Sequence, residues 1–238
     1  TVMTLRLSYI GIEAVDLDAW HRFGDLVGLQ IERDRDCLYF RVDDRARRII
    51  VTKGARDDVV WIGSEVDSNE DLDASVRRIR ASGQTVQDGT PADAALRAVE
   101  RFARFVDPNG TPMELTVGPR LASTSFWSPR IKYGFVTGAL GLGHVVVPTD
   151  DYKKGGAFCL DFQSAAPSDH IFMLTHHGAF EASFLHTNPR HHSIAYVQSP
   201  MPRNKRVHHF VIHCREIEDV GRAYDRLGAA GMSFGAWI

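Results

Sequence analysis

The stretch LGLGHVVVPTDD (residues 140–151) repeats the pattern with which the chain opens at LRLSYIGIEAV (residues 5–15). Each stretch is rich in alternating or continuous apolar residues, which predicts a strand. Each is followed by a predicted helix, over residues 152–160 and 16–28 respectively. Internal repetition of this kind indicates the architecture of the whole chain. The chain is therefore predicted to consist of repeated units.

Four such units follow one another, each with a strand, a helix and then up to three more strands. The second unit begins at VVWIGSEV (residues 59–66), and its last strand, MELTV (residues 113–117), follows the turn DPNG (residues 107–110). The fourth unit begins at RVHHFVIHC (residues 206–214). This order predicts an α+β protein of two domains, each built from two βαβββ repeats.

The predicted domains are an N-terminal domain over residues 1–117 and a C-terminal domain over residues 140–238. Residues 118–139 lose the periodicity and are predicted to be a linker. The fourth repeat is predicted to be incomplete, because only residues 232–238 follow its helix, whereas the second repeat continues over residues 84–118. Three closing strands are therefore expected beyond residue 238.

The composition narrows the possible partners and the compartment. The 28 Lys and Arg residues are balanced by 30 Asp and Glu, so no basic excess suggests a nucleic-acid partner. No apolar run reaches the length of a membrane span, and the N-terminus lacks the pattern of a signal peptide. Cys37, Cys159 and Cys214 are widely spaced, which argues against a disulfide scaffold and predicts a cytoplasmic protein.

Histidine is concentrated in the second half of the chain. Of the 11 histidines, only His21 precedes residue 143, and the other ten lie between His144 and His213. Histidine binds metals and transfers protons near neutral pH. Chemistry is therefore expected in the C-terminal domain.

Two of these histidines stand at equivalent positions of the third and fourth repeats. His144 lies on the first strand of the third unit, and His208 or His209 lies on the first strand of the fourth. Equivalent strands can lie side by side, so two imidazoles can converge and form a metal site that still lacks a carboxylate. The alternative is that these histidines are buried and merely hydrogen-bonded. Glu114, on the last strand of the second unit, marks where a carboxylate would stand, and its counterpart in the fourth unit is expected beyond residue 238.

A second pair of histidines lies in NPRHHSIAY (residues 188–196), which reads as a half-buried strand. Alternation allows only one of His191 and His192 to face the interior. It places His192 on the same face as Ile194 and Tyr196.

Several motifs together resemble those of a known enzyme family. LGLGH (residues 140–144), RHHSIAY (190–196), KRVHHF (205–210) and EIEDVGRAYDRL (216–227) resemble the catalytic half of type I extradiol ring-cleavage dioxygenases, and within them the 2,3-dihydroxybiphenyl 1,2-dioxygenase group. DPNGTPMEL (107–115) resembles the matching signature of the vicinal oxygen chelate superfamily, to which that family belongs. The similarity extends over nearly the whole chain, and it implies the vicinal oxygen chelate, or glyoxalase-like, fold.

The resemblance assigns roles to individual residues. It implies that His144 and His209 are iron ligands, that His192 is the catalytic acid–base, and that the face carrying His192 points at the metal pocket. His191 and His208 are then expected to face away. The glutamate that completes the ligand set is expected beyond residue 238. The residues expected to line the substrate pocket are Val146, Phe184 and Ala195.

The resemblance also implies that the N-terminal domain holds no metal. Tyr9 occupies the strand position at which His144 stands in the C-terminal domain. Glu114 is therefore expected to be a structural relic of a ligand.

The implied activity is extradiol (meta) cleavage of a substituted catechol such as 2,3-dihydroxybiphenyl, in aromatic hydrocarbon catabolism. The implied cofactor is non-haem Fe(II), with Mn(II) as the other metal that accepts such ligands. The implied partners are the catechol and O2, without nucleic acid or membrane, and a homo-oligomer is expected. Two alternatives stay open: a glyoxalase-like metalloenzyme on the same scaffold, and an inactive small-aromatic binding protein, because the third ligand is missing.

Overall fold

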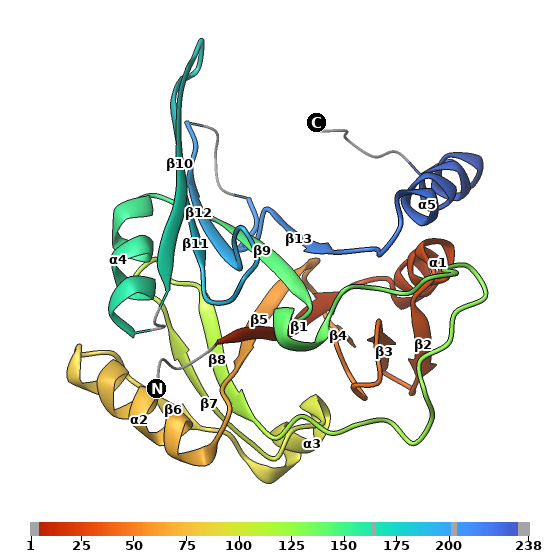
Figure 1. Ribbon diagram of the computed structural model, residues 1–238, viewed down its shortest axis with the longest axis horizontal. Coiled ribbons are helices and arrows are strands. Elements are labelled where there is room, and N and C mark those ends of the chain that lie inside the picture. Colours follow the sequence, from red (N-terminus) through yellow and green to blue (C-terminus); the bar gives the residue numbers. More distant parts are fainter. Residues whose placement is uncertain (1–4, 163–164, 201–203, 233–238) are drawn as a thin grey trace.

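The computed structural model describes residues 5–162, 165–200 and 204–232. Its strands form two sheets with helices packed against them, which is the α+β arrangement that the sequence predicts (Figure 1). No disulfide joins the three cysteines, all of which lie in this part of the chain. Within the same residues, no helix combines the length and the apolar character that a membrane crossing requires.

The first sheet contains the first two repeats. Its first repeat comprises β1 (Arg6–Ala14), α1 (Leu17–Val27), β2 (Gln30–Arg33), β3 (Cys37–Arg41) and β4 (Ile49–Lys53). Its second repeat comprises β5 (Asp58–Glu65), α2 (Asn69–Ala81), β6 (Gln87–Asp88), α3 (Pro91–Arg97), β7 (Arg101–Val106) and β8 (Pro112–Val117). The strand order is β2-β3-β4-β1-β5-β8-β7-β6. The opening strands β1 and β5 lie antiparallel at the centre, and each pairs in parallel with the last strand of its own repeat.

The second sheet repeats this plan. The third repeat comprises β9 (Gly143–Thr149), α4 (Tyr152–Phe162), β10 (Ala166–Thr175), β11 (Gly178–His186) and β12 (Ile194–Gln198). The fourth repeat contains β13 (His209–Ile212) and α5 (Ile217–Ala229), and residues 233–238 lie outside the described part of the chain. The strand β9 pairs in parallel with β12 and antiparallel with β13, as β1 does with β4 and β5.

Local signals explain where the helices begin and end. The carboxylate of Asp16 accepts hydrogen bonds from the first backbone N–H groups of α1, and Gly28 ends that helix in the left-handed region with φ of 86°. Neither α3 nor β6 is predicted from the periodicity. The start of α3 is nevertheless encoded, because the hydroxyl of Thr90 accepts from Asp93 N–H and Pro91 stands at the first helical position.

One glycine lets the two opening strands of the second sheet meet. A Cβ built on Gly143 would lie 1.7 Å from the carbonyl oxygen of Val211 on β13. Any side chain at this position would therefore force β13 away from β9. The glycine that precedes His144 in LGLGH is thus required for the pairing that brings the two repeats together.

The DPNG turn joins the two sheets as well as ending a strand. The carboxylate of Asp107 accepts hydrogen bonds from the backbone N–H groups of Asn109 (2.9 Å) and Thr111 (2.7 Å) within the turn. Its other oxygen accepts from the hydroxyl of Tyr196 on β12, at 3.0 Å, and both side chains are buried. Burial raises the pKa of Asp107, and the three donors oppose that shift. The turn of the N-terminal domain therefore fixes a strand of the C-terminal domain.

Replacing Tyr196 with Phe is expected to lower the free energy of unfolding by about 1–3 kcal/mol, because a buried carboxylate loses a hydrogen-bond donor. Urea denaturation measures this change. The matched control is Tyr133→Phe, at an exposed tyrosine, for which a change below about 0.5 kcal/mol is expected. Equal stability of Tyr196→Phe and the wild type would show that this contact does not hold the two sheets together.

Candidate metal and active site

His144 and His209 lie on the same face of the second sheet. The pairing of β9 with β13 sets Val146 opposite His209 and Val211 opposite His144, so the two histidines are diagonal neighbours. Their ring centroids are 5.7 Å apart, and the ring planes are inclined by 75°. Of the two candidates, His208 and His209, the structure thus brings the ring of His209 to His144.

His192 joins this pair from the loop before β12. Its ring centroid lies 4.0 Å from that of His144 and 5.0 Å from that of Phe184. The prediction that alternation groups His192 with Ile194 and Tyr196 on the pocket face is wrong. The strand begins only at Ile194, and Tyr196 packs beneath Gly155 of α4 on the opposite face. We name the three converging side chains, His144, His192 and His209, the histidine cluster.

Polar side chains anchor the loop that carries His192. The side-chain oxygen of Asn188 accepts from the backbone N–H of Arg190, at 3.0 Å. The guanidinium of Arg190 donates to the carbonyl oxygens of Leu140 (2.9 Å) and Val136 (2.8 Å). The first residues of NPRHH therefore tie His192 to the segment that leads into β9.

An apolar floor lies on the same face of the sheet as the cluster. Val146 is opposite Ala195 on β12, and Ala195 is opposite Phe184 on β11, so the three predicted pocket residues form one row. Ala182, Val197 and Phe180 belong to the same cluster of packed side chains. Ala182 and Phe180 were detectable in the sequence, because they alternate with Phe184 along one strand.

The histidine cluster is held in the neutral form. Burial, followed by the neighbouring His192 and His209, lowers the pKa of His144 to about 3. Burial and the neighbouring His191 and His209 lower the pKa of His192 to about 4, and burial also lowers the pKa of His209. A neutral imidazole carries a free lone pair on one ring nitrogen. That nitrogen can bind a metal ion or accept a proton.

In each HH pair, the histidine outside the histidine cluster contacts the histidine that belongs to it. The Nδ1 atoms of His191 and His192 are 3.0 Å apart, and those of His208 and His209 are 2.7 Å apart. In each pair one nitrogen must donate and the other accept, which leaves Nε2 of His192 and His209 for other contacts. His191 and His208 are exposed, as is His209 itself, and their contacts with the adjacent rings were not predicted. The repetition of HH at both positions is the signal that could have revealed them.

The remaining histidines of this domain have other partners. Nδ1 of His213 lies 3.1 Å from the guanidinium of Arg190, and Nδ1 of His186 lies 2.7 Å from the hydroxyl of Ser168. His176 and His177 contact each other in the turn between β10 and β11, with their ring planes inclined by 46°, and His170 stacks on Tyr152. Among the described residues, none of these five rings contacts the histidine cluster.

Known proteins share both halves of this chain. The family model described as "Dihydroxybiphenyl dioxygenase BphC D1" matches residues 7–54, and the model of the "Glyoxalase/Bleomycin resistance protein/Dioxygenase superfamily" matches residues 141–236. The biphenyl-2,3-diol 1,2-dioxygenase of Pseudomonas sp. (strain KKS102) is 37% identical over 95% of this chain and 78% of its own length. That of Paraburkholderia xenovorans (strain LB400) is 36% identical over 97% of this chain and 78% of its own.

Solved structures agree with these relatives. A crystal structure of catechol 2,3-dioxygenase superposes with a TM-score of 0.88 at 29% identity, over 96% of this chain and 81% of that one. The chain belongs to the extradiol ring-cleavage dioxygenases of the vicinal oxygen chelate superfamily.

The donor atoms of this dioxygenase fit part of a metal site. The nitrogens of His144 and His209 suit a divalent transition metal. Within residues 5–162, 165–200 and 204–232, no three His, Cys, Asp or Glu side chains gather closely enough to hold a metal ion. The predicted carboxylate ligand lies outside these described residues.

In the N-terminal domain, other side chains occupy the positions that correspond to His144 and His209. Tyr9 lies opposite Gly63, and Gly11 lies opposite Trp61, so Tyr9 corresponds to His144 and Trp61 corresponds to His209. Glu114 on β8 is the neighbour of Gly63 in the next strand. The two positions that carry imidazoles in the second sheet thus carry a phenol and an indole in the first.

Glu114 binds a cation of the protein itself. The guanidinium of Arg97 donates to both carboxylate oxygens at 2.6 Å, and the hydroxyl of Tyr9 donates to one of them at 2.7 Å. Arg97 also lies over the ring of Trp61, with its central carbon 4.2 Å from the ring centroid. Arg97 and Glu114 are each only 3% exposed. These contacts give Glu114 a structural role, as expected, with Arg97 neutralising its charge.

The variant Arg97→Met is expected to lose about 3–5 kcal/mol of unfolding free energy, because Glu114 would remain as a buried charge without its cation. The double variant Arg97→Met/Glu114→Met is expected to recover most of this loss, because well-packed apolar side chains replace a buried ion pair at little cost. Chemical denaturation of the three proteins measures both effects. A double variant as unstable as Arg97→Met would contradict this explanation.

Proposed function

We propose that this chain cleaves a substituted catechol beside its diol, by extradiol (meta) cleavage with O2, in aromatic hydrocarbon catabolism. One observation carries the proposal: the histidine cluster converges above an apolar floor, in a member of the extradiol family. Relatives are named for biphenyl-2,3-diol, 1,2-dihydroxynaphthalene and 3-methylcatechol. Their common chemistry, an aromatic ring with adjacent hydroxyls and a substituent, supports 2,3-dihydroxybiphenyl as a substrate of this chain.

We further propose that His144 and His209 hold Fe(II) through ring nitrogens, with Mn(II) as the alternative metal. The neutral state of both imidazoles and their common face support this assignment. A carboxylate is expected to complete the ligand set. When bound, the metal supplies Lewis acidity and open coordination positions for the diol and for dioxygen.

In this proposal His192 is the residue that moves a proton. Its ring is neutral and lies beside His144, and when its Nδ1–H donates to Nδ1 of His191, Nε2 can accept the proton of a diol hydroxyl. Val146, Phe184 and Ala195 form the floor against which the aromatic ring of the substrate would lie. This apolar floor excludes water from one face of the ring and orients the diol toward the histidines.

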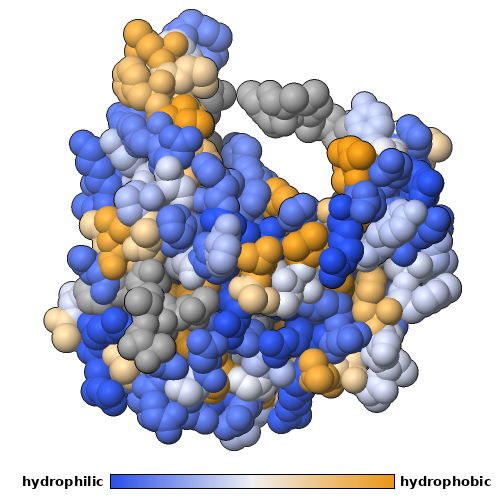
Figure 2. All heavy atoms as spheres, viewed as in Figure 1, coloured by the Kyte–Doolittle hydropathy of each residue, from blue (hydrophilic) through white to orange (hydrophobic). Residues whose placement is uncertain are grey.

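Assembly into a homo-oligomer is supported by one exposed surface. The strand β10 stands at the edge of its sheet, and its apolar side chains Ile171, Phe172, Met173 and Leu174 are exposed. They lie on the projecting β10–β11 hairpin, where Figure 2 shows hydrophobic residues gathered. Exposed apolar side chains on an edge strand favour association with another chain. We also propose that the chain is cytoplasmic and that residues 118–139 link an N-terminal domain over residues 1–117 to a C-terminal domain over residues 140–238.

The variant His192→Gln is expected to keep its Fe(II) content and to lower kcat by about 10²–10⁴-fold, which is the usual contribution of a general base. Metal analysis and the formation of the yellow ring-opened product from 2,3-dihydroxybiphenyl measure the two effects. His186→Gln is the matched control, because His186 bonds to Ser168 outside the cluster. Loss of iron in His192→Gln, or unchanged kcat, would contradict the assigned role.

The variant Ala195→Leu places a larger side chain on the floor of the pocket. It is expected to lower kcat/KM for 2,3-dihydroxybiphenyl more than for catechol, by about 10–200-fold, because the second ring needs the space. The exposed Ala179→Leu, on the neighbouring strand β11, is the control. Equal losses for both substrates would show that Ala195 does not line the substrate pocket.

A further inference from the structure

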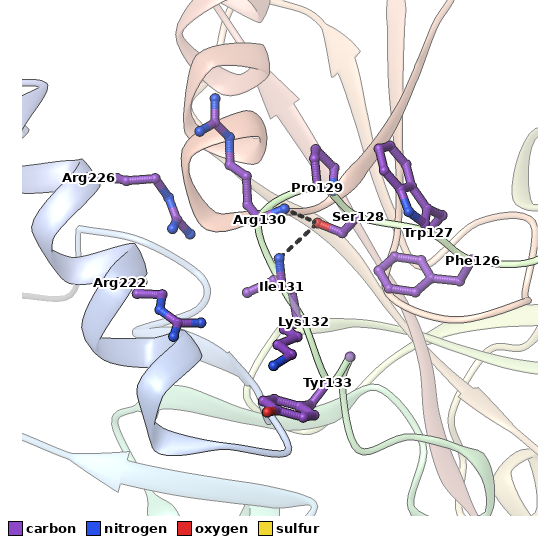
Figure 3. A pocket seen from close by; sticks show the side chains of 11 residues that line it. Phe126, Trp127, Ser128, Pro129, Arg130, Ile131, Lys132, Tyr133, Arg222 and Arg226 are labelled. Atoms are coloured by element: carbon purple, nitrogen blue, oxygen red, sulfur yellow. Dashed lines mark hydrogen bonds between the residues drawn. The ribbon is translucent and has the colours of Figure 1, made fainter.

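A second cavity lies between the linker and α5. It has a volume of about 820 Å³ and is lined by residues 126–134 together with Arg222 and Arg226. It contains no histidine and shares no lining residue with the histidine cluster. Figure 3 shows Arg222 and Arg226 extending from α5 toward the linker, with Lys132 and Tyr133 on the other side of the gap.

The side chains around this cavity carry an excess of positive charge. Arg130, Lys132, Arg222 and Arg226 line it, whereas no acidic residue does. Two acids that interact electrostatically with Arg226, Asp25 and Asp219, are already engaged by protein groups. Asp25 accepts two hydrogen bonds from Arg130, at 3.1 and 2.6 Å.

The second nearby acid, Asp219, is fully buried at the start of α5. It accepts from the backbone N–H groups of Lys132 (3.3 Å) and Tyr133 (3.2 Å), and it lies 3.6 Å from Arg222. Its charge is therefore shared among three groups. Arg226 has no acidic partner among the ion pairs of the described residues.

Arg226 has a buried donor with no acceptor. Its Nε donates to the carbonyl oxygen of Leu26 at 2.7 Å, which fixes the guanidinium beside the end of α1. Its Nη2 is buried and has no hydrogen-bond partner among the described residues. Burial, together with the charge of Arg130, also lowers the pKa of Arg226. A buried N–H group without an acceptor is unfavourable, and an anion in the cavity would satisfy it after a small movement of the partly exposed Arg226 side chain.

We propose that this cavity binds a small oxyanion of the phosphate or carboxylate type. Arg222 and Arg226 stand one turn apart on α5, so both guanidinium groups can reach one ligand, and the planar guanidinium matches the oxygens of such anions. Lys132 adds a third positive charge from the linker. The bound anion would connect the linker to α5, and the proposal does not depend on the dioxygenase activity.

Thermal unfolding of the whole chain in increasing inorganic phosphate tests this site. The melting temperature is expected to rise in a saturable way, by about 3–6 °C when phosphate is about tenfold above its dissociation constant. Sodium chloride at matched ionic strength controls for general salt effects. Parallel titrations with sulfate and benzoate distinguish a phosphate site from a carboxylate site. A response to benzoate alone identifies a carboxylate site, whereas a response to phosphate and sulfate identifies a phosphate site.

Two variants connect the response to the cavity. Arg226→Met and the more exposed Arg222→Met are each expected to weaken the saturable response at least tenfold, whereas Arg77→Met, an exposed arginine on α2, should leave it unchanged. Because Arg222 lies at the surface, its variant keeps the test valid if Arg226→Met does not fold. A rise in melting temperature that sodium chloride reproduces, or that is equal in Arg222→Met and the wild type, would overturn the proposal.

Discussion

The antiparallel contact between β9 and β13 is the constraint on which the site depends. It requires Gly143, since a side chain there would collide with the carbonyl of Val211. Given this contact, the register places His144 and His209 on one face as diagonal neighbours. The paired strands come from different repeats, so the histidine cluster exists only when both repeats fold against each other. His192 then joins from a loop that is itself tied to the segment before β9.

The first sheet has the same geometry with different chemistry. Tyr9 and Trp61 occupy the places of the two histidines, and Glu114 is kept but binds Arg97. The guanidinium of Arg97 thus neutralises the charge of Glu114, as a metal ion would neutralise a carboxylate ligand. Both sheets therefore place these side chains at the same position, where the opening strands of two repeats meet. The difference between them is which side chains the sequence puts at those positions.

Much of this arrangement could be predicted from the sequence, because repeats reveal themselves by periodicity. The order of strands and helices and the convergence of His144 with a histidine of the fourth repeat follow from equivalent positions alone. The direction in which His192 points could not be predicted in this way. Alternation holds only within a strand, and β12 begins after His192, at Ile194. The orientation of the loop depends instead on the long-range hydrogen bonds of Arg190. Arg97 was also not foreseen, since it comes from a short helix without an apolar periodicity.

We propose that the first strands of the third and fourth repeats together hold a metal ion. This can be tested by anaerobic titration of the wild-type chain with Fe(II), with binding measured by calorimetry and metal analysis. We expect saturable binding of one Fe(II) per chain, and we expect His144→Ala and His209→Ala each to abolish this binding although both variants remain folded by circular dichroism. Iron binding by both variants at the wild-type affinity would contradict it.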